Sequence, residues 1–213
     1  MYNPLIAPSL LACDFSTLGK QVAQVETAGC KMLHLDVMDG HFVPNISFGP
    51  QVVADLRKIS KMIFDVHLMI TNPTHYIDAF EKAGADIITF HLECNEDTTK
   101  VIEKIRKTKC KVGLSIKPGT TPKSIMPYLP LIDMILVMSV EPGYGGQRFM
   151  PESVDKIKIL RQAAPNLDIQ VDGGINNQTA KLVLDAGANI LVAGTAVFGS
   201  DNYAKAMSEL LQK

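Results

Sequence analysis

The sequence predicts an α/β protein whose fold is a single (β/α)8 TIM barrel spanning residues 1–213. Short apolar runs, typical of buried parallel strands, alternate along the chain with amphipathic helical stretches. A helix, an Ala-Gly pair and a strand follow one another three times, in "ETAGCKMLHLD", "EKAGADIITFHLE" and "LDAGANILVAGTAVF". No segment has the composition of a linker. An open doubly wound sheet is the alternative, and the lack of a GxGxxG motif after the first strand argues against it.

The expected strands are short and apolar, and many of their residues are β-branched. In the three repeats, Gly29, Gly84 and Gly187 suit the left-handed position that follows the last helical residue. An apolar strand then begins within a few residues of each glycine. In chain order, the expected strands are Leu5–Leu10, Met32–Val37, Met62–Leu68, Asp86–His91, Lys111–Ile116, Met134–Met138, Asp168–Asp172 and Asn189–Ala193.

Amphipathic stretches between these runs predict one helix after each strand. Pro73, Pro122 and Pro151 stand where helices are expected to begin, a position that favours proline. The expected helices are Ser16–Ala28, Pro50–Lys58, Thr74–Ala83, Thr98–Thr108, Pro122–Tyr128, Pro151–Ala163, Gln178–Asp185 and Asn202–Leu211.

Composition and charge narrow the classes of partner. The 213 residues are 46% hydrophobic and 20% charged, with a net charge of −1, which gives no electrostatic reason to expect nucleic acid or a membrane surface. The four cysteines are scattered without CxxC spacing, as reduced thiols of a cytoplasmic protein are. We expect no signal peptide and no membrane span, because no apolar run approaches about 20 residues.

Ionisable side chains gather at the predicted carboxyl ends of strands, where barrels of this class carry their sites. In "LHLDVMDGHFVPN", His34 and Asp36 share one face, because strand side chains alternate with period two. "DVHLM" repeats the arrangement with Asp65 and His67, and "VDGG" ends the seventh strand with Asp172. Imidazoles and carboxylates converging from separate strands suit a divalent transition metal. For any one of these residues alone, a hydrogen-bonded polar group is the plainer interpretation.

Other residues at the strand ends leave alternatives open. His91 and Glu93 follow the fourth strand, and periodicity does not decide whether they bind the metal or support it. Met38, Met69 and Met138 also end strands. They suit either core packing or an apolar, water-poor lining around a reacting carbon.

Three glycine-rich turns follow the sixth, seventh and eighth strands and are expected to meet on one side of the mouth. Glycine lets backbone N–H groups approach an anion closely, and phosphate groups bind in this region of many barrels. The turns therefore predict a phosphate site. Their residues are Gly143, Gly145 and Gly146, then Gly173 and Gly174, then Gly194 and Thr195.

The joint pattern resembles the ribulose-phosphate 3-epimerase family. The resemblance extends from "APSLLACDF" through "LHLDVMDGHFVPN", "FDVHLM", "VMSVEPGYGGQ" and "VDGGI" to "AGTAVF", essentially the whole chain. It implies a barrel of the ribulose-phosphate-binding type and interconversion of D-ribulose 5-phosphate and D-xylulose 5-phosphate. It also implies a homo-oligomer and one divalent metal ion, with zinc first and iron, manganese or cobalt as alternatives.

The resemblance also assigns roles to residues. It implies metal ligands at His34, Asp36, His67 and Asp172, with Asp36 and Asp172 as the catalytic acid/base pair. A pair of such groups suits two-base proton transfer through a metal-stabilised ene-diolate. His91 and Glu93 then become supporting or packing residues. The implied substrate-binding residues are Ser9, His34, His67, Met38, Met69, Met138, Gly143, Tyr144, Gly145, Gly146, Asp172, Gly173, Gly174, Gly194 and Thr195.

The chain departs from the family pattern at Lys117, where asparagine is common. A strand-end lysine can form a Schiff base in barrel aldolases, but a solvated lysine near the rim is the preferred interpretation. The nearest rival function is another ketose-phosphate 3-epimerase, such as one for D-allulose 6-phosphate. A decarboxylase or aldolase would be expected to use more lysines, and a sugar-phosphate binding module needs no acid/base pair. For Asp39 and His41 the sequence supports a structural role, and for the "GHFVPN" loop a lid-like one.

Overall fold

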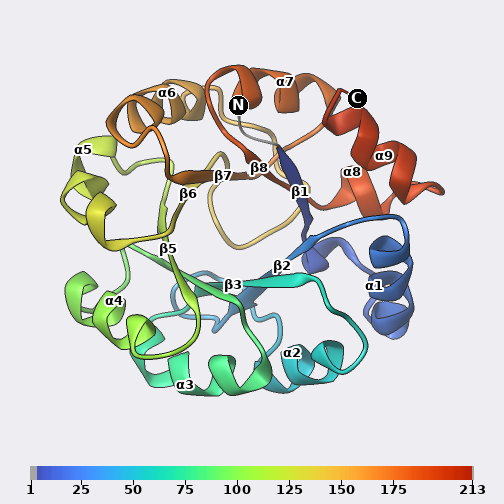
Figure 1. Cartoon of the computed structure of the whole chain (residues 1–213), viewed down its shortest axis with the longest axis horizontal. Coiled ribbons are helices and arrows are strands. Elements are labelled where there is room, and N and C mark those ends of the chain that lie inside the picture. Colours follow the sequence, from blue (N-terminus) through green and yellow to red (C-terminus); the bar gives the residue numbers. More distant parts are fainter. Residues whose placement is uncertain (1–3, 213) are drawn as a thin grey trace.

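The computed structural model describes residues 4–212, and within them eight parallel strands form one sheet in the order β1-β8-β7-β6-β5-β4-β3-β2. A single bridge between Ser9 and His34 joins β1 to β2 at the remaining gap. Helices surround the ring of strands on its outside (Figure 1). The predicted barrel is therefore confirmed, and the open doubly wound alternative is wrong.

The strands lie close to their expected positions. The expected first strand was too long, because the chain turns after Pro8 into a 3-10 helix, η1 (Leu10–Ala12), capped by the Ser9 hydroxyl. The other seven strands fall within one residue of the expected bounds. The strands are β1 (Leu5–Pro8), β2 (Met32–Met38), β3 (Ile63–Met69), β4 (Ile87–His91), β5 (Lys111–Ile116), β6 (Met134–Met138), β7 (Asp168–Asp172) and β8 (Ile190–Ala193).

The helices depart from expectation in two places. The helix expected after β5 continues beyond α5 as a 3-10 helix, η3 (Met126–Leu131), because Pro127 and Pro130 lack the N–H that an α-helix needs. A short helix after β8, α8, was not expected, since four residues are too few for a periodic pattern. The helices are α1 (Leu18–Thr27), α2 (Pro50–Arg57), α3 (Pro73–Ala83), α4 (Thr98–Arg106), α5 (Pro122–Ile125), α6 (Ser153–Ala163), α7 (Asn177–Asp185), α8 (Thr195–Phe198) and α9 (Tyr203–Leu210), with a 3-10 turn, η2 (Phe15–Thr17), before α1.

The main core lies between the barrel and the helices, where outward-facing strand residues such as Leu35, Val66 and Val171 are completely buried. Alternate residues point into the barrel. A smaller apolar cluster fills part of this interior, and it consists of Ala7, Met32, Ile87, Met134, Ile190 and Val192. Other inward positions, toward the carboxyl ends of the strands, carry buried polar side chains such as His34, Asp36 and His67, and these form the site. Among the described residues, no helix combines the length and apolar character that crossing a bilayer requires.

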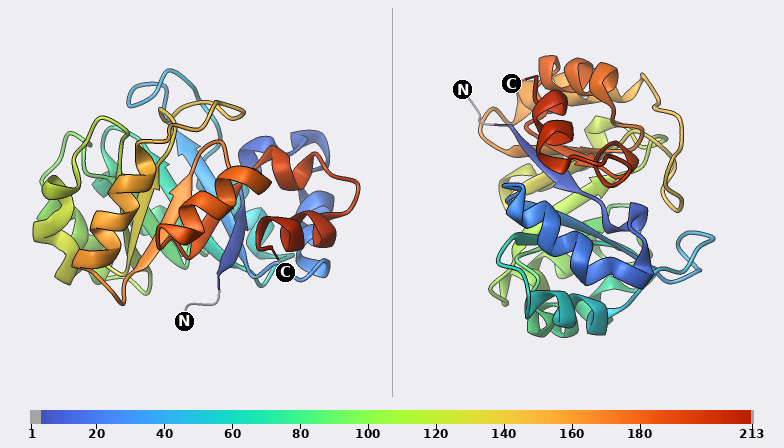
Figure 2. Two further views of the ribbon diagram at one scale, coloured as in Figure 1. Left: turned by 90° about the horizontal axis from the view of Figure 1, so that it is seen from above. Right: turned by 90° about the vertical axis from the view of Figure 1, so that its right-hand side faces the viewer.

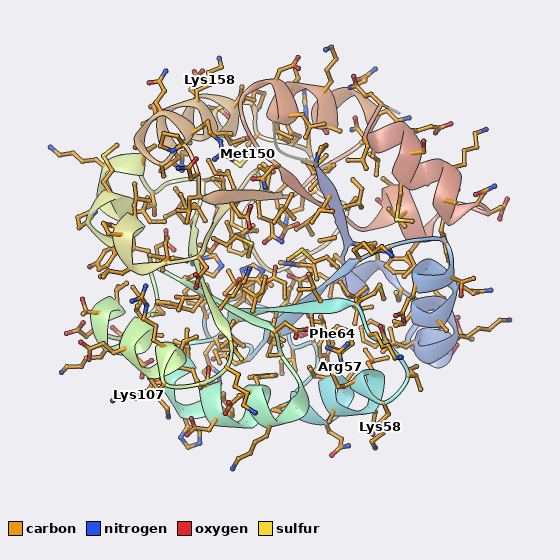
Figure 3. The ribbon with its side chains drawn as sticks, viewed as in Figure 1. Arg57, Lys58, Phe64, Lys107, Met150 and Lys158 are labelled. Atoms are coloured by element: carbon orange, nitrogen blue, oxygen red, sulfur yellow. The ribbon has the colours of Figure 1, made fainter. Side chains whose placement is uncertain are left out.

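Arg57, the last residue of α2, ties the amino-terminal end of the barrel together. Its guanidinium donates to the carbonyl oxygens of Ser60 and Gly84 and pairs with Asp86 at 3.0 Å. It also lies over the ring of Phe64, 3.8 Å from the ring centroid, between α2 and β3 (Figure 3). One side chain thus joins the loops before β3 and β4.

The three repeat glycines have the expected left-handed backbone, with φ of 95° at Gly29, 100° at Gly84 and 112° at Gly187. Their surroundings differ. A Cβ on Gly84 would lie 2.4 Å from Cδ of Arg57, whereas no heavy atom of the described residues lies within 4 Å of a Cβ on Gly29. Gly29 is therefore a matched control for Gly84, with nearly the same φ and open space.

We expect Gly29→Ala to lower the free energy of unfolding by about 1–2 kcal/mol, the usual penalty for a left-handed alanine. Gly84→Ala is expected to lower it by about 1–2 kcal/mol more, because the new methyl displaces Arg57 from its hydrogen bonds. Urea unfolding of the two variants and the unmodified chain measures both values. Equal losses would show that Arg57 accommodates the methyl and does not hold this end of the barrel.

Candidate metal centre and active site

Four of the polar side chains that point inward from the strand ends converge. Their ligand atoms, one each from His34, Asp36, His67 and Asp172, lie within 4.8 Å of one another. Nδ1 of His67 is 3.0 Å from Oδ1 of Asp36 and 3.2 Å from Nε2 of His34. Nε2 of His34 is 3.2 Å from Oδ1 of Asp36 and 4.0 Å from Oδ2 of Asp172. The barrel thus gathers residues that lie up to 138 positions apart in the chain.

The donor set fits a divalent transition metal. Two imidazole nitrogens and two carboxylate oxygens are ligands that zinc accepts, and for bonds of about 2.0–2.2 Å neighbouring ligand atoms lie roughly 3–3.5 Å apart. Three of the separations in the cluster fall in that range. Lone pairs this close repel unless a proton or a cation lies between them. The assignment of these four residues as metal ligands stays a prediction.

Asp65 lies beneath the cluster and holds His34 in place. Because a carboxylate only accepts hydrogen bonds, Nδ1 of His34 carries the proton and donates it to Oδ2 of Asp65 at 2.8 Å. Thr89 donates to Oδ1 of Asp65 at 2.6 Å, and the amide of Gln170 donates to Oδ2 at 2.8 Å. All four side chains are completely buried. This network turns Nε2 of His34 toward the cluster.

The two carboxyl groups of the predicted acid/base pair have different pKa values. Burial alone would raise the pKa of Asp36, but His34 and His67 outweigh burial and hold it well below its usual range. Burial and the neighbouring Asp36 carboxylate raise the pKa of Asp172 to about 6. Burial alone would lower the pKa of His34, but Asp36 and Asp65 raise it well above its ordinary value. Two carboxyl groups with separated pKa values are the arrangement that acid and base roles require.

A cavity of about 660 Å³ opens above the cluster and receives most of the predicted substrate-binding residues. His34 and His67 are the exceptions, because both are completely buried and neither lines the cavity. Met38, Met69 and Met138 are each at most 3% exposed and form its apolar wall. The predicted residues that line it are Ser9, Asp36, Met38, Met69, Met138, Gly143, Tyr144, Gly145, Gly146, Asp172, Gly173, Gly174, Gly194 and Thr195.

Comparison with known proteins decides the family. The profile of the ribulose-phosphate 3 epimerase family matches residues 5–198. The chain is 47% identical over 213 residues to a ribulose-phosphate 3-epimerase of Synechocystis, covering 97% of this chain and 92% of the relative. It is 42% identical over 209 residues to a cytoplasmic isoform of the enzyme from Oryza sativa, covering 96% and 92%. The chain belongs to the ribulose-phosphate 3-epimerase family.

The fold of this epimerase-family chain is shared more widely. A mutant tryptophan synthase α-subunit from Pyrococcus furiosus superposes with a TM-score of 0.75 over the whole of both chains, at 16% sequence identity. Identity this low shows a common barrel fold alone. The specific chemistry of the epimerase-family chain must therefore be argued from its site.

Two loops of the epimerase-family chain rise on the same side of the barrel, one after β2 and one after β6 (Figure 2). They are joined to each other, because Asn45 donates to the carbonyl oxygen of Gly143 at 2.8 Å and the Tyr144 hydroxyl donates to Pro44 at 2.6 Å. The lid-like role predicted for the "GHFVPN" loop stays a prediction, and Tyr144 provides one of the two contacts between the loops.

Asp39, at the base of the first loop, has the structural role that the sequence suggested. Its Oδ1 accepts from the backbone N–H groups of His41 and Phe42, and its Oδ2 accepts from that of Thr71. Hydrogen bonds from these backbone groups lower the pKa of Asp39 against the opposing effect of burial. Its carboxylate therefore fixes the start of the loop and is not part of the four-residue cluster.

Lys117 does not take a catalytic position. Its ammonium lies over the ring of Phe42, 3.9 Å from the centroid, at the rim above β4 and β5. It is not among the described residues that line the cavity. This placement agrees with the preferred rim interpretation and gives no support to a Schiff-base lysine.

Sequence reasoning missed some residues of the site. The part that Gln170 and Thr89 play in holding Asp65 was not predicted, although both precede predicted residues by two positions and so share their inward faces. Arg148 also lines the cavity and was not predicted. Its position directly after the glycine-rich turn "PGYGGQ" is the signal that could have found it.

Proposed function

We propose that the chain is a ribulose-phosphate 3-epimerase that interconverts D-ribulose 5-phosphate and D-xylulose 5-phosphate. In this proposal Asp36 and Asp172 transfer the protons, and His34, Asp36, His67 and Asp172 hold one divalent metal ion. The observation that carries it is the pair of carboxyl groups with separated pKa values in one four-donor cluster at the floor of the cavity. Family membership supports the same activity.

The chemistry requires two proton-transferring groups. Inversion at C3 removes a proton from one face of the carbon and returns one to the opposite face. Asp36, whose pKa is depressed, is the base that accepts the proton of the ribulose phosphate, and Asp172, whose pKa is raised, is the acid that donates one. The roles exchange in the reverse reaction. When bound, the divalent ion supplies a Lewis acid that stabilises the negative charge developing on the substrate oxygen.

Three neighbouring groups support the pair. The Ser9 hydroxyl donates to Oδ2 of Asp36 at 2.6 Å, and so orients that carboxylate at the edge of the cavity. The thioether side chains of Met38 and Met69 pack together and limit the access of water. Because water is excluded, it cannot protonate the carbanionic intermediate on the wrong face.

The glycine-rich turns are the proposed phosphate site. Gly173 and Gly174 have φ of 120° and 61°, and a Cβ on either would lie 2.5 Å from Val140 or from the backbone of Phe149. Only glycine fits both the backbone conformation and the space. These turns, with Gly143 to Gly146 and the Gly194–Thr195 segment, line the cavity and bring main-chain groups close to a bound anion.

Among the described residues that line the cavity, Arg148 is the one with a permanent positive charge. Arg148→Gln is expected to raise KM for the phosphorylated ketose about tenfold, since a charge-assisted contact to phosphate contributes about 1.5 kcal/mol, and to leave kcat within about twofold. Steady-state kinetics measure both constants. Lys158→Gln, on the outer face of α6, is the matched control. An unchanged KM would remove Arg148 from the phosphate site.

A conversion assay tests the proposed function. The metal-loaded protein is supplied with D-ribulose 5-phosphate or, separately, with D-allulose 6-phosphate, and the products are followed by NMR. We expect kcat/KM for the pentulose phosphate to exceed that for the hexulose phosphate at least about tenfold. A preference for the hexulose phosphate would support the rival epimerase, and conversion of neither would contradict an epimerase function.

We further propose zinc as the native ion, with iron, manganese or cobalt able to occupy the same donor set. Metal analysis of the protein purified without added metal, followed by removal and reconstitution, identifies it. The four buried, unpaired cysteines fit a reducing compartment, which supports a cytoplasmic location. A homo-oligomer is the assembly that we expect, and light scattering of the eluted protein measures its mass.

A further inference from the structure

A second chain of hydrogen bonds reaches the metal cluster from the rim of the mouth. Nε2 of His67 lies 2.8 Å from Nε2 of His91, and Nδ1 of His91 lies 3.2 Å from Oε2 of Glu93. The two rings are stacked, with centroids 5.0 Å apart. Both imidazoles are completely buried, whereas the Glu93 side chain is 21% exposed. This chain of hydrogen bonds therefore runs from a carboxylate near solvent, that of Glu93, to a proposed metal ligand, His67.

The end of this chain at Glu93 is fixed by its surroundings. Its Oε1 accepts from the backbone N–H of Lys117 at 2.8 Å and from the hydroxyl of Thr120. Its Oε2 faces His91 and, as a carboxylate oxygen, only accepts. Nδ1 of His91 must therefore carry a hydrogen.

The position of that hydrogen determines the rest of the chain. Complete burial favours the neutral ring of His91, so its Nε2 is left as an acceptor. His67 must then donate from its own Nε2, and a neutral ring, the form that binds a metal, keeps its lone pair on Nδ1. Nδ1 of His67 is the atom that lies 3.0 Å from Asp36 and 3.2 Å from His34 in the cluster.

We propose that Glu93 and His91 are positioning residues that fix the tautomer of His67, so that its Nδ1 lone pair faces the metal. The proposal rests on the metal centre of the proposed function. It gives His67 the same kind of support that Asp65 gives His34, through one additional imidazole. Ligating histidines are commonly oriented by a group on their second ring nitrogen, and loss of such a group lowers metal affinity about 10- to 100-fold.

The tautomer of His91 is the most direct test. Long-range proton–nitrogen NMR spectra of the zinc-loaded protein, labelled with nitrogen-15 in histidine, report which ring nitrogen carries the hydrogen. We expect His91 to carry it on Nδ1 and His67 on Nε2. A hydrogen on Nε2 of His91 would overturn the proposal, because His91 could then not accept a hydrogen bond from Nε2 of His67.

The same spectra separate failure of the proposal from failure of the proposed function. Zinc is expected to shift the resonances of Nε2 of His34 and Nδ1 of His67. If both shift but His91 carries its hydrogen on Nε2, the metal centre stands and the positioning role is wrong. If neither shifts, the metal centre is wrong and the positioning role falls with it.

Glu93→Gln tests the role through affinity. The Lys117 N–H requires an acceptor, so the amide oxygen takes the place of Oε1 and the NH₂ group faces His91, which reverses the hydrogen bonds of the chain. We expect about 10- to 100-fold weaker binding of zinc, measured by competition with a chromogenic chelator. Glu96→Gln is the control, since Glu96 lies in the same loop and accepts from the backbone of Thr74. Equal zinc affinities of the two variants would overturn the proposal.

Discussion

Replacing Asp172 with asparagine is expected to lower kcat for epimerisation by at least about 10³-fold while the barrel stays folded. An amide of the same shape neither donates nor accepts the proton that C3 exchanges. The side chain of Asp172 ends β7 and reaches the cavity, with 18% of it exposed, so the fold does not depend on its charge. Asp36→Asn is expected to cause a similar loss. Progress curves with D-ribulose 5-phosphate, normalised to bound metal, measure both.

Asp168, four positions earlier on β7, provides the matched control. It lies at the opposite end of the strand and accepts from the amide of Asn189 at 2.7 Å. Asp168→Asn keeps the volume and removes a carboxylate from the same strand, and we expect kcat within about twofold of the unmodified chain. An Asp172→Asn variant that retains metal and near-full kcat would exclude Asp172 as a proton-transferring group.

Replacing Asp65 with alanine is expected to destabilise the metal-free protein by about 3–5 kcal/mol. The change would leave the N–H of His34, the hydroxyl of Thr89 and the amide of Gln170 without their common acceptor in a completely buried place. Burial alone would raise the pKa of Asp65, but His34, Thr89 and Gln170 outweigh it and keep the carboxylate ionised. Urea unfolding in the presence of a chelator measures the difference.

Asp65→Asn separates the effect of charge from that of volume. Its amide oxygen can accept from His34 and Gln170, while its NH₂ group meets the Thr89 hydroxyl, which can turn to accept. We therefore expect a smaller loss, about 1–2 kcal/mol. If the alanine variant lost less than about 1 kcal/mol, the polar interior would not be held together by Asp65.

The sequence alone sufficed to predict which side chains point into the barrel. Strand side chains alternate with period two, so His34 and Asp36 had to share a face, as did Asp65 and His67. The sequence did not suffice to predict how deep in the barrel each of these side chains lies. The register pairs His34 with Asp65 and Asp36 with His67, so one carboxylate lies a layer deeper than the other. That stagger is a property of the closed barrel, not of any one strand.

The sequence alone did not predict the contacts between loops or the orientation of the imidazole rings. The hydrogen bond between Tyr144 and Pro44 joins residues 100 positions apart in the chain, and no local sequence pattern predicts it. Whether His91 binds the metal or supports a ligand depends on its rotamer. The sequence predicts only that His91 lies on the inward face of its strand. Arg148 lies in a turn without periodicity, so its place in the cavity wall followed only from the path of the chain between β6 and α6.

The most direct test of two-base epimerisation is the isotope at C3 in a single turnover. The metal-loaded protein, in excess over D-ribulose 5-phosphate, is mixed with substrate in heavy water and quenched early, and the C3 position of each ketose is read by NMR. Two separate acid/base groups predict that the D-xylulose 5-phosphate formed carries solvent deuterium at C3 from the first turnover. Product that retains the substrate's own hydrogen at C3 would contradict removal of one proton by Asp36 and donation of a different proton by Asp172.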